Sequence, residues 1–214
     1  MKKIILVSSL ALACALPAVS HAESNFTNPA ASTSTASGKL DFTVVVPSVL
    51  FLRIGTGGVV GAAGGLIDSL TFTVPAANIG DGTVITATGS DLPAGAVTVR
   101  VFSNFGSAVN LNSSVAGPLL NVAGDAIGWA QITVAQGALA ATTPGFTNTG
   151  ITHPAFSASS TGGAGTAITL AAAGKLVRQE GTWTFSYSNT AVVPAGAYGT
   201  SARNGRVTYT ATQV

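Results

Sequence analysis

Cysteine is all but absent from this sequence. Cys14 is the only one among 214 residues, and it lies in an N-terminal segment that we expect to be removed. The remaining chain therefore has no means of forming an internal disulfide bond, and its stability has to come from apolar burial. A chain of roughly 190 residues is long enough to bury one good core without cross-links.

Charge is also scarce, because only 7% of the residues are Asp, Glu, Lys or Arg. The formal net charge of +2 is contributed by Lys2 and Lys3, so a chain without its first 22 residues is neutral. A neutral chain with so few charged residues has no basic patch of the kind that attracts nucleic acids or anionic membranes. It also gives little protection against association of the protein with copies of itself.

Groups that carry catalysis or bind metals are few. His153 is the only histidine beyond residue 22, and we interpret it as a solvated loop residue next to Pro154. The acidic residues are scattered, without the spacing of a calcium loop or a carboxylate dyad, and a single histidine without cysteine does not make a zinc site. The six glycines of residues 55–66 are not followed by Gly-Lys-Ser/Thr, so this stretch is a loop without a phosphate-binding motif. We expect no enzyme, no catalytic residue, no cofactor and no metal.

Residues 1–22 have the layout of a cleavable secretory signal peptide. Lys2 and Lys3 precede a short apolar stretch, and Ser20-His21-Ala22 places small residues at the positions that a signal peptidase reads. The apolar stretch is too short to span a bilayer. We therefore expect Sec-type export to the periplasm, cell surface or exterior, with a mature N-terminus at Glu23.

The mature chain is expected to contain a flexible polar leader, residues 23–38, and a single β-sandwich domain, residues 39–214. Small and polar residues dominate the leader. The following stretch, 40–54, is apolar with alternation at Leu40, Phe42, Val44 and Val46, and is interrupted by Pro47. It predicts two strands, or one strand bent at the proline.

Further strand-like segments recur at intervals of about 8–12 residues, separated by clusters of glycine, proline and asparagine. They cover residues 69–74, 83–88, 96–103, 108–115, 126–134 and 167–170. Only 136–141 and 170–177 indicate a turn or two of helix, and 142–165 is predicted to be a long surface loop. This pattern predicts an all-β fold, an Ig-like antiparallel β-sandwich of about eight to ten short strands.

Two aromatic strands end the chain and are expected to close the fold. In the first, alternate positions are occupied by Trp183, Phe185 and Tyr187; in the second, by Val207, Tyr209 and Ala211. Small polar residues lie between them, which indicates one buried face per strand. Asn204-Gly205 precedes the last strand and is interpreted as a hairpin turn, although Asn204-Gly205-Arg206 is also similar to a short adhesion tripeptide.

The order of these features resembles fimbrial (pilin-like) subunits of the bacterial chaperone–usher type. The resemblance rests on the polar leader, the alternating strand and the ending 194–199 followed by Gly205-Arg-Val-Thr-Tyr209-Thr. The disulfide common in that family is absent, and Tyr209 is sixth from the end rather than penultimate. In that family each subunit lacks one strand, which the N-terminal extension of its neighbour supplies.

The resemblance implies a structural or adhesive surface protein that polymerises by strand pairing. Its partners would be further copies or related subunits, and a periplasmic chaperone and usher. The inserted row would be Leu40, Phe42, Val44 and Val46, by strand addition to an open edge. The same row read as an ordinary first strand of its own domain stays open.

Two other functions also stay open. One is a secreted carbohydrate-binding or adhesive module, in which the row of Trp183, Phe185 and Tyr187 would be an exposed platform for sugar stacking. The other is a small outer-membrane β-barrel, which requires longer alternating strands and aromatic girdles than this sequence contains.

Overall fold

The computed structural model describes residues 25–27 and 35–214. The expected signal peptide, residues 1–22, and residues 23–24 and 28–34 of the expected leader lie outside the described residues. The described chain divides into two units. The first comprises the described residues up to Val46, and the second, Pro47–Val214, is the β-sandwich.

The larger sheet of the sandwich is organised around β11 (Val177–Tyr187), its longest strand. One edge of β11 pairs antiparallel with β3 (Ala96–Ser103), and β3 pairs in turn with β1 (Leu50–Ile54). The other edge pairs antiparallel with β7 (Ile132–Gly137). Two short strands complete this sheet, the antiparallel β2 (Ile85–Thr86) and the parallel β8 (Thr147–Asn148).

The second sheet has β4 (Val109–Val115) at its centre and is antiparallel throughout. The C-terminal strand β12 (Val207–Gln213) pairs with one edge of β4, and β10 (Ile168–Leu170) and β9 (Gly163–Ala164) pair with the other. A separate two-stranded ribbon joins β5 (Leu119–Leu120) and β6 (Ala126–Ile127). The remaining elements are short 3-10 helices: η1 (Ala76–Asn78), η2 (Trp129–Gln131) and η3 (Ser201–Arg203).

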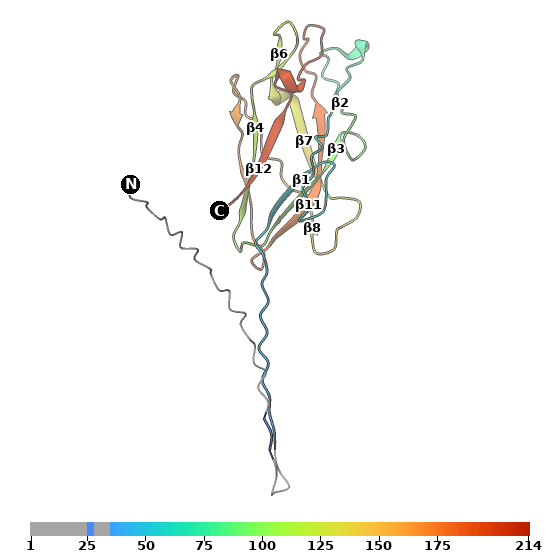
Figure 1. Ribbon diagram of the computed structural model, residues 1–214. Helices are drawn as coiled ribbons and strands as arrows, with labels where there is room; N and C mark the ends of the chain where they lie inside the picture. Colours follow the sequence, from blue (N-terminus) through green and yellow to red (C-terminus); the bar gives the residue numbers. More distant parts are fainter. Residues whose placement is uncertain (1–24, 28–34) are drawn as a thin grey trace, which may run out of the picture. The chain divides into compact units, whose positions relative to one another are not determined.

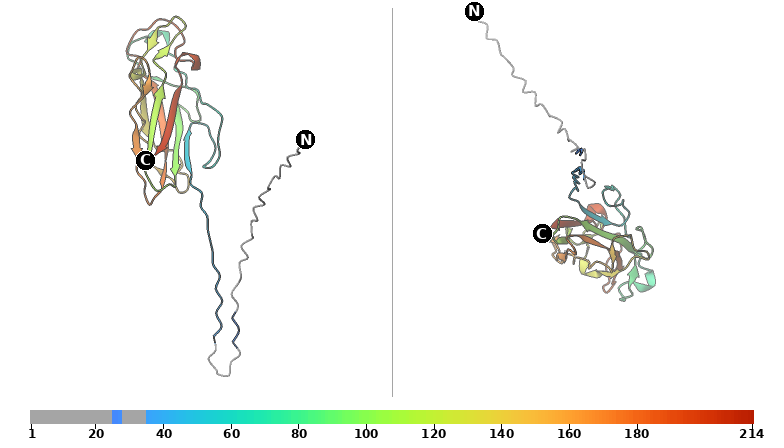
Figure 2. Two further views of the ribbon diagram at one scale, coloured as in Figure 1. Left: turned by 60° about the vertical axis from the view of Figure 1, so that its left-hand side comes forward. Right: turned by 90° about the horizontal axis from the view of Figure 1, so that it is seen from below.

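The predicted all-β fold class is confirmed: the regular secondary structure is almost entirely strand, and open, mainly antiparallel sheets face each other as in a sandwich (Figures 1 and 2). The alternation of each strand decides its inner face, because successive side chains point to opposite sides of a sheet. Val99 and Val101 of β3 and Leu111 of β4 are completely buried between the sheets. Trp183 of β11 packs into the same core cluster.

Strand register defines the two ends of the sandwich. Leu50 and Val177 both pair with Ser103, and the short connection 104–108 joins Ser103 to Val109. We call this end the base. At the opposite end, Val207 pairs with Val115, and the connections 116–131 and 188–206 emerge there. We call it the far end.

The sequence correctly predicted several strands but misplaced others. Residues 96–103 form β3 as predicted, and the strand predicted over 108–115 begins at Val109. No strand precedes Leu50 in residues 35–49, and residues 69–74 contribute only an isolated bridge from Thr71 to Thr88. A strand needs a neighbour to pair with its backbone groups, and alternation in one segment does not provide that neighbour.

The segments predicted as helical turns and as a surface loop are also different in the structure. Residues 136–137 end β7, and no α-helix occurs in the described residues. The segment 142–165 contains β8 and β9 and passes through the core, where Ile151 is 1% exposed. Asn204-Gly205 does not form a hairpin between the last two strands, because β11 and β12 belong to different sheets. Asn204 instead has a left-handed backbone conformation that ends η3.

Candidate functional site

The candidate site is the side of the sandwich formed by the unpaired edges of β1 and β12. β1 is the last strand of the larger sheet and β12 is the last strand of the smaller one. The two strands approach each other across the gap between the sheets (Figure 2). Within the described residues, no strand pairs with the second edge of either. Such an edge presents a row of free backbone N–H and C=O groups to another chain.

The inner side chains along these two edges are only partly covered. Leu52 and Ile54 of β1 pair with the completely buried Val101 and Val99, so they face inward, yet both remain partly exposed. On β12 the inward residues are Val207, Tyr209 and Ala211, which pack against the core cluster and are also partly exposed. The hydrophobic core therefore reaches solvent along the line between β1 and β12.

His153 lies beneath this line, and the interpretation of it as a solvated loop residue is wrong. Its Nε2 atom shares a 2.7 Å hydrogen bond with the Tyr209 hydroxyl. The rings of Phe156, Trp183, Phe185 and Tyr209 surround the imidazole, with ring centroids 4.6–5.7 Å away. The physical reason is that segment 150–156 passes between the sheets, with Ile151 in the core, so His153 is partly buried although it lies in a connection.

This packing makes His153 a poor base and keeps its ring neutral. Burial lowers the pKa of His153 to about 4, because desolvation disfavours the charged imidazolium. Burial likewise raises the pKa of Tyr209. The pair supports β12 from inside through one neutral hydrogen bond. A hollow of about 380 Å³, lined in part by Trp129, Phe156 and His153, opens beside it.

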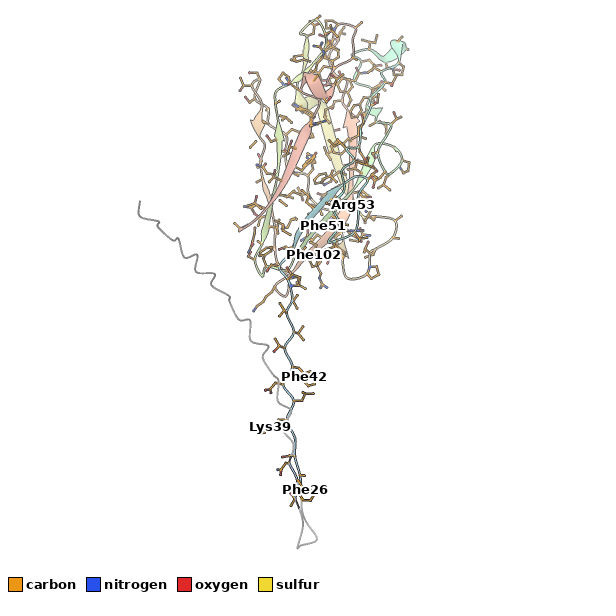
Figure 3. The ribbon with its side chains drawn as sticks, in the orientation of Figure 1. Phe26, Lys39, Phe42, Phe51, Arg53 and Phe102 are labelled. Carbon is orange, nitrogen blue, oxygen red and sulfur yellow. The ribbon has the colours of Figure 1, made fainter. Side chains whose placement is uncertain are left out.

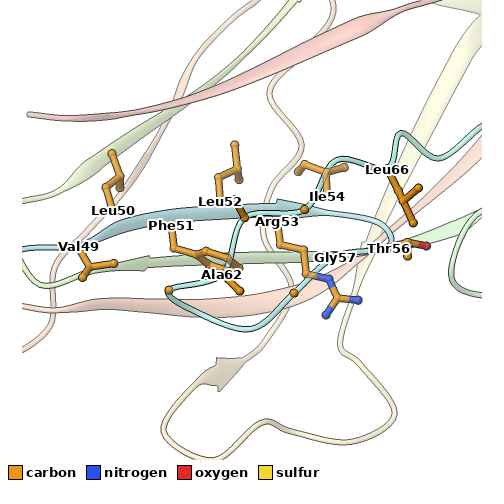
Figure 4. Close-up of a pocket in the computed structure, with 14 residues that line it drawn as sticks. Val49, Leu50, Phe51, Leu52, Arg53, Ile54, Thr56, Gly57, Ala62 and Leu66 are labelled. Carbon is orange, nitrogen blue, oxygen red and sulfur yellow. The ribbon is translucent and has the colours of Figure 1, made fainter.

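The glycine-rich loop that follows β1 forms a second hollow. Residues 55–66 run back alongside β1, and together they line a hollow of about 510 Å³ (Figure 4). The Asp68 carboxylate accepts a 2.7 Å hydrogen bond from the Thr56 backbone N–H and fixes the start of the loop. No helix follows the loop, so its backbone N–H groups do not converge on an anion in the way of a phosphate-binding loop. The loop is relevant to the candidate site because it lies beside the unpaired edge of β1.

The N-terminal unit contains the apolar row that the sequence singled out. Its backbone follows an extended path from residue 35 to residue 46 (Figure 1), and Phe42 and Lys39 project from it (Figure 3). The row is exposed to solvent, and the exposed fractions are 69% for Leu40, 84% for Phe42, 85% for Val44 and 72% for Val46. Four large apolar side chains at alternate positions, all open to water, are typical of a segment that is covered by another chain.

The second set of predicted residues lies in the core. Trp183 is completely buried on β11, with Phe185 and Tyr187 6% and 5% exposed. This row is therefore not an exposed platform on which a sugar could stack. Val207 and Tyr209 of β12 are half-buried and belong to the edge described above.

A buried ion pair that sequence reasoning missed holds a connection onto the outer face of the larger sheet. Arg100 and Glu180 are cross-strand partners, with Arg100 Nη2 2.7 Å from Glu180 Oε2. The Thr143 backbone N–H donates a 2.6 Å hydrogen bond to Glu180 Oε1, and the Arg100 guanidinium lies 5.0 Å from the Phe146 ring centre. Phe51, Arg53 and Phe102 belong to this same region of β1 and β3 (Figure 3). The sequence contains both residues, but it does not show the strand register that makes them neighbours.

In residues 25–27 and 35–214, no three His, Cys, Asp or Glu side chains gather closely enough to hold a metal ion. No helix in that part of the chain is both long enough and apolar enough to cross a membrane.

Comparison with known proteins provides no family assignment. No protein-family model, curated protein or solved structure matches this chain.

Proposed function

We propose that this protein is an exported structural subunit that polymerises by strand pairing. Residues 40–46 of one copy add to the unpaired edge of β12 in another copy. The observation that carries the proposal is the match between an exposed apolar row and an incompletely covered core. The row has 69–85% of each side chain in water, and the inward residues of β12 and β1 are only partly covered.

The lengths and periods of the two partners agree. Residues 40–46 span seven positions, and β12 also has seven residues. Because side chains alternate along a strand, Leu40, Phe42, Val44 and Val46 all face the same side and would cover the inward residues of the two edges. Asp41 and Thr43 would then face solvent, as the polar residues of β12 do.

The gain in free energy comes from apolar burial and from satisfied backbone groups. Full burial of a Val, Leu or Phe side chain contributes about 1.5–3 kcal/mol, so four of them make a stable contact even after the cost of ordering the strand. Pairing also closes an edge that would otherwise attract unrelated strands. The neutral mature chain adds little long-range repulsion between copies.

The family resemblance implies two further partners. A periplasmic chaperone would cover the same edge before assembly, and an usher would receive the subunit at the outer membrane. Both follow from the resemblance to fimbrial subunits and extend the proposal from self-assembly to export.

The test places charge on the row. Phe42→Asp with Val44→Asp should block polymerisation and leave a folded monomer, because these side chains would contact only the neighbouring copy. Fibres are measured by negative-stain microscopy and sedimentation, and folding by circular dichroism and the midpoint of urea unfolding. Thr43→Asp with Val45→Asp is the matched control, since it adds the same charge to the opposite face.

Two results would reject strand donation from this segment. One is fibres of normal length from the Phe42→Asp, Val44→Asp variant. The other is unfolding of the isolated protein by the same change, which would assign the row to the protein's own core. Equal loss of fibres in the matched control would show that charge alone, and not the apolar face, is responsible.

A further inference from the structure

We infer that consecutive subunits also dock end to end, with the base of one copy against an apolar patch at the far end of the next. By far-end patch we mean the exposed apolar side chains of Ile79, Val84 and Val192 around η1, together with Val122 in the turn between β5 and β6 at the same end. The inference rests on the proposed strand donation and adds a second, separate interface between copies of this chain.

A short connection joins the apolar row to the sandwich. Only residues 47–49 separate Val46 from β1, and three residues span at most about 11 Å. Asn104 restricts the reach of this connection further through two hydrogen bonds. Its Oδ1 accepts a 2.7 Å hydrogen bond from the Val49 N–H, and its Nδ2 donates a 2.8 Å bond to the Pro47 carbonyl. The base of a donating copy must therefore lie close to the point where its donated strand ends.

The direction of the donated strand also limits where the donor lies. Every pairing within the smaller sheet is antiparallel, and antiparallel ladders have the better hydrogen-bond geometry. A strand antiparallel to β12 ends beside Val207, which lies at the far end of the receiving sandwich. Combined with the short connection, this direction brings the base of the donor onto the far end of the acceptor.

The far end presents the apolar patch. Its four apolar side chains are well exposed: 52% of Ile79, 60% of Val84, 81% of Val122 and 76% of Val192. They lie in connections between strands, but hydrogen bonds to Asn189 hold the connection that contains η1 in place. Asn189, 2% exposed, accepts a 3.0 Å hydrogen bond from the Gly80 N–H through its Oδ1, and its carbonyl accepts one of 2.9 Å from the Gly82 N–H. A fixed apolar surface loses little conformational freedom on docking.

The base offers an apolar counterpart beside the donated strand. Phe105 is 43% exposed and directly follows Asn104, which binds the connection to the row. Leu50, 37% exposed, begins β1 at the same end. When residues 40–46 of one copy pair with β12 of the next, Phe105 and Leu50 of the first copy lie at the far end of the second and can cover its apolar patch.

Chemical cross-linking tests the arrangement, because the chain beyond Cys14 has no cysteine of its own. Phe105→Cys marks the base and Val192→Cys marks the far end, in a Cys14→Ser background. A bis-maleimide linker is applied to assembled fibres, since it tolerates wider separations than a disulfide does. The double variant should give a ladder of covalent oligomers on a denaturing gel, and each single variant should remain monomeric.

A matched control moves the second cysteine away from the far end. Val59 is 70% exposed in the loop beside β1, so Phe105→Cys with Val59→Cys should not give a ladder. A second series with Val122→Cys in place of Val192→Cys should reproduce the ladder.

The outcomes separate this inference from the function on which it rests. Fibres that the Phe42→Asp, Val44→Asp change abolishes, but that give no ladder with either far-end cysteine, reject only the end-to-end contact. Covalent dimers from Phe105→Cys alone show base against base, the result of a parallel donated strand, and also reject it. A ladder from the Val59 control equal to that of the far-end pair rejects the patch. An absence of fibres, or fibres indifferent to the charged row, rejects the proposed function as well.

Discussion

At the scale of single residues, Trp183 combines packing with a specific hydrogen bond. Its ring is completely buried, and its Nε1 donates a 2.6 Å hydrogen bond to the Ile151 carbonyl. The bond attaches the connection 150–156 to β11 in the middle of the core. Trp183→Ala would leave a large cavity and an unsatisfied carbonyl.

We expect Trp183→Ala to reduce the free energy of unfolding by about 3–5 kcal/mol, measured by urea denaturation. Trp129 is the other tryptophan, so a Trp129→Phe background isolates the emission of Trp183, which should be blue-shifted. Emission typical of indole in water would contradict the burial of Trp183.

His153 makes the stability depend on pH. Its folded pKa is about 4, and an unfolded histidine titrates near 6.5, so between these values the unfolded chain binds more protons. The stabilisation is complete above pH 6.5 and is lost as pH falls through 4. We expect a loss of roughly 2–3 kcal/mol across this window, measured by urea unfolding at each pH.

The matched variant for this prediction is His153→Gln, which retains a hydrogen-bonding group toward Tyr209 and does not titrate. Its stability should vary less between pH 6.5 and 4 than that of the parent protein. Tyr209, which shares a hydrogen bond with the imidazole, stays neutral throughout this range because burial raises its pKa. Equal pH slopes for the two proteins would show that other groups cause the effect.

At the scale of elements, the pair of Arg100 and Glu180 attaches a long connection to the larger sheet. Glu180 is completely buried, and Thr143 donates a backbone N–H to it. Removal of one partner leaves a buried charge, so Arg100→Met should cost about 3–5 kcal/mol. Arg100→Met with Glu180→Met should recover most of that loss, because both charges are then gone. The double-mutant cycle is measured by urea unfolding.

Limited proteolysis reports the role of the pair in holding the connection. Arg100→Met should make residues 138–148 more susceptible to cleavage than β3 or β11, because Thr143 loses its orientation. A uniform increase of cleavage along the chain would instead indicate global destabilisation.

At the scale of the whole molecule, we expect the folded chain to be the one that remains after a signal peptide is removed. The charged start, the short apolar stretch and Ser20-His21-Ala22 predict a mature protein that begins at Glu23. Intact-mass spectrometry of the protein from its native host should give the mass of residues 23–214 without modification. A retained Met1 or a lipid on Cys14 would contradict this prediction.

The sequence alone determined the properties that depend on local alternation and composition. Period-two patterns predicted the β3, β4 and β12 segments and placed Trp183, Phe185 and Tyr187 on one face, because a strand alternates its side chains wherever it lies in a sheet. The absence of cysteine pairs and the low charge similarly implied a core of packed apolar residues. These properties need no knowledge of which segments become neighbours.

Only the tertiary structure decided which segments meet. His153 lies among aromatic rings, and Arg100 faces Glu180 80 positions away, because register and sheet order bring distant residues together. The same applies to the unpaired edges of β1 and β12, since a missing neighbour is a property of the assembled sheets and not of either strand. Leu40 to Val46 has a strand pattern but no partner strand, because pairing requires a second edge at the right place.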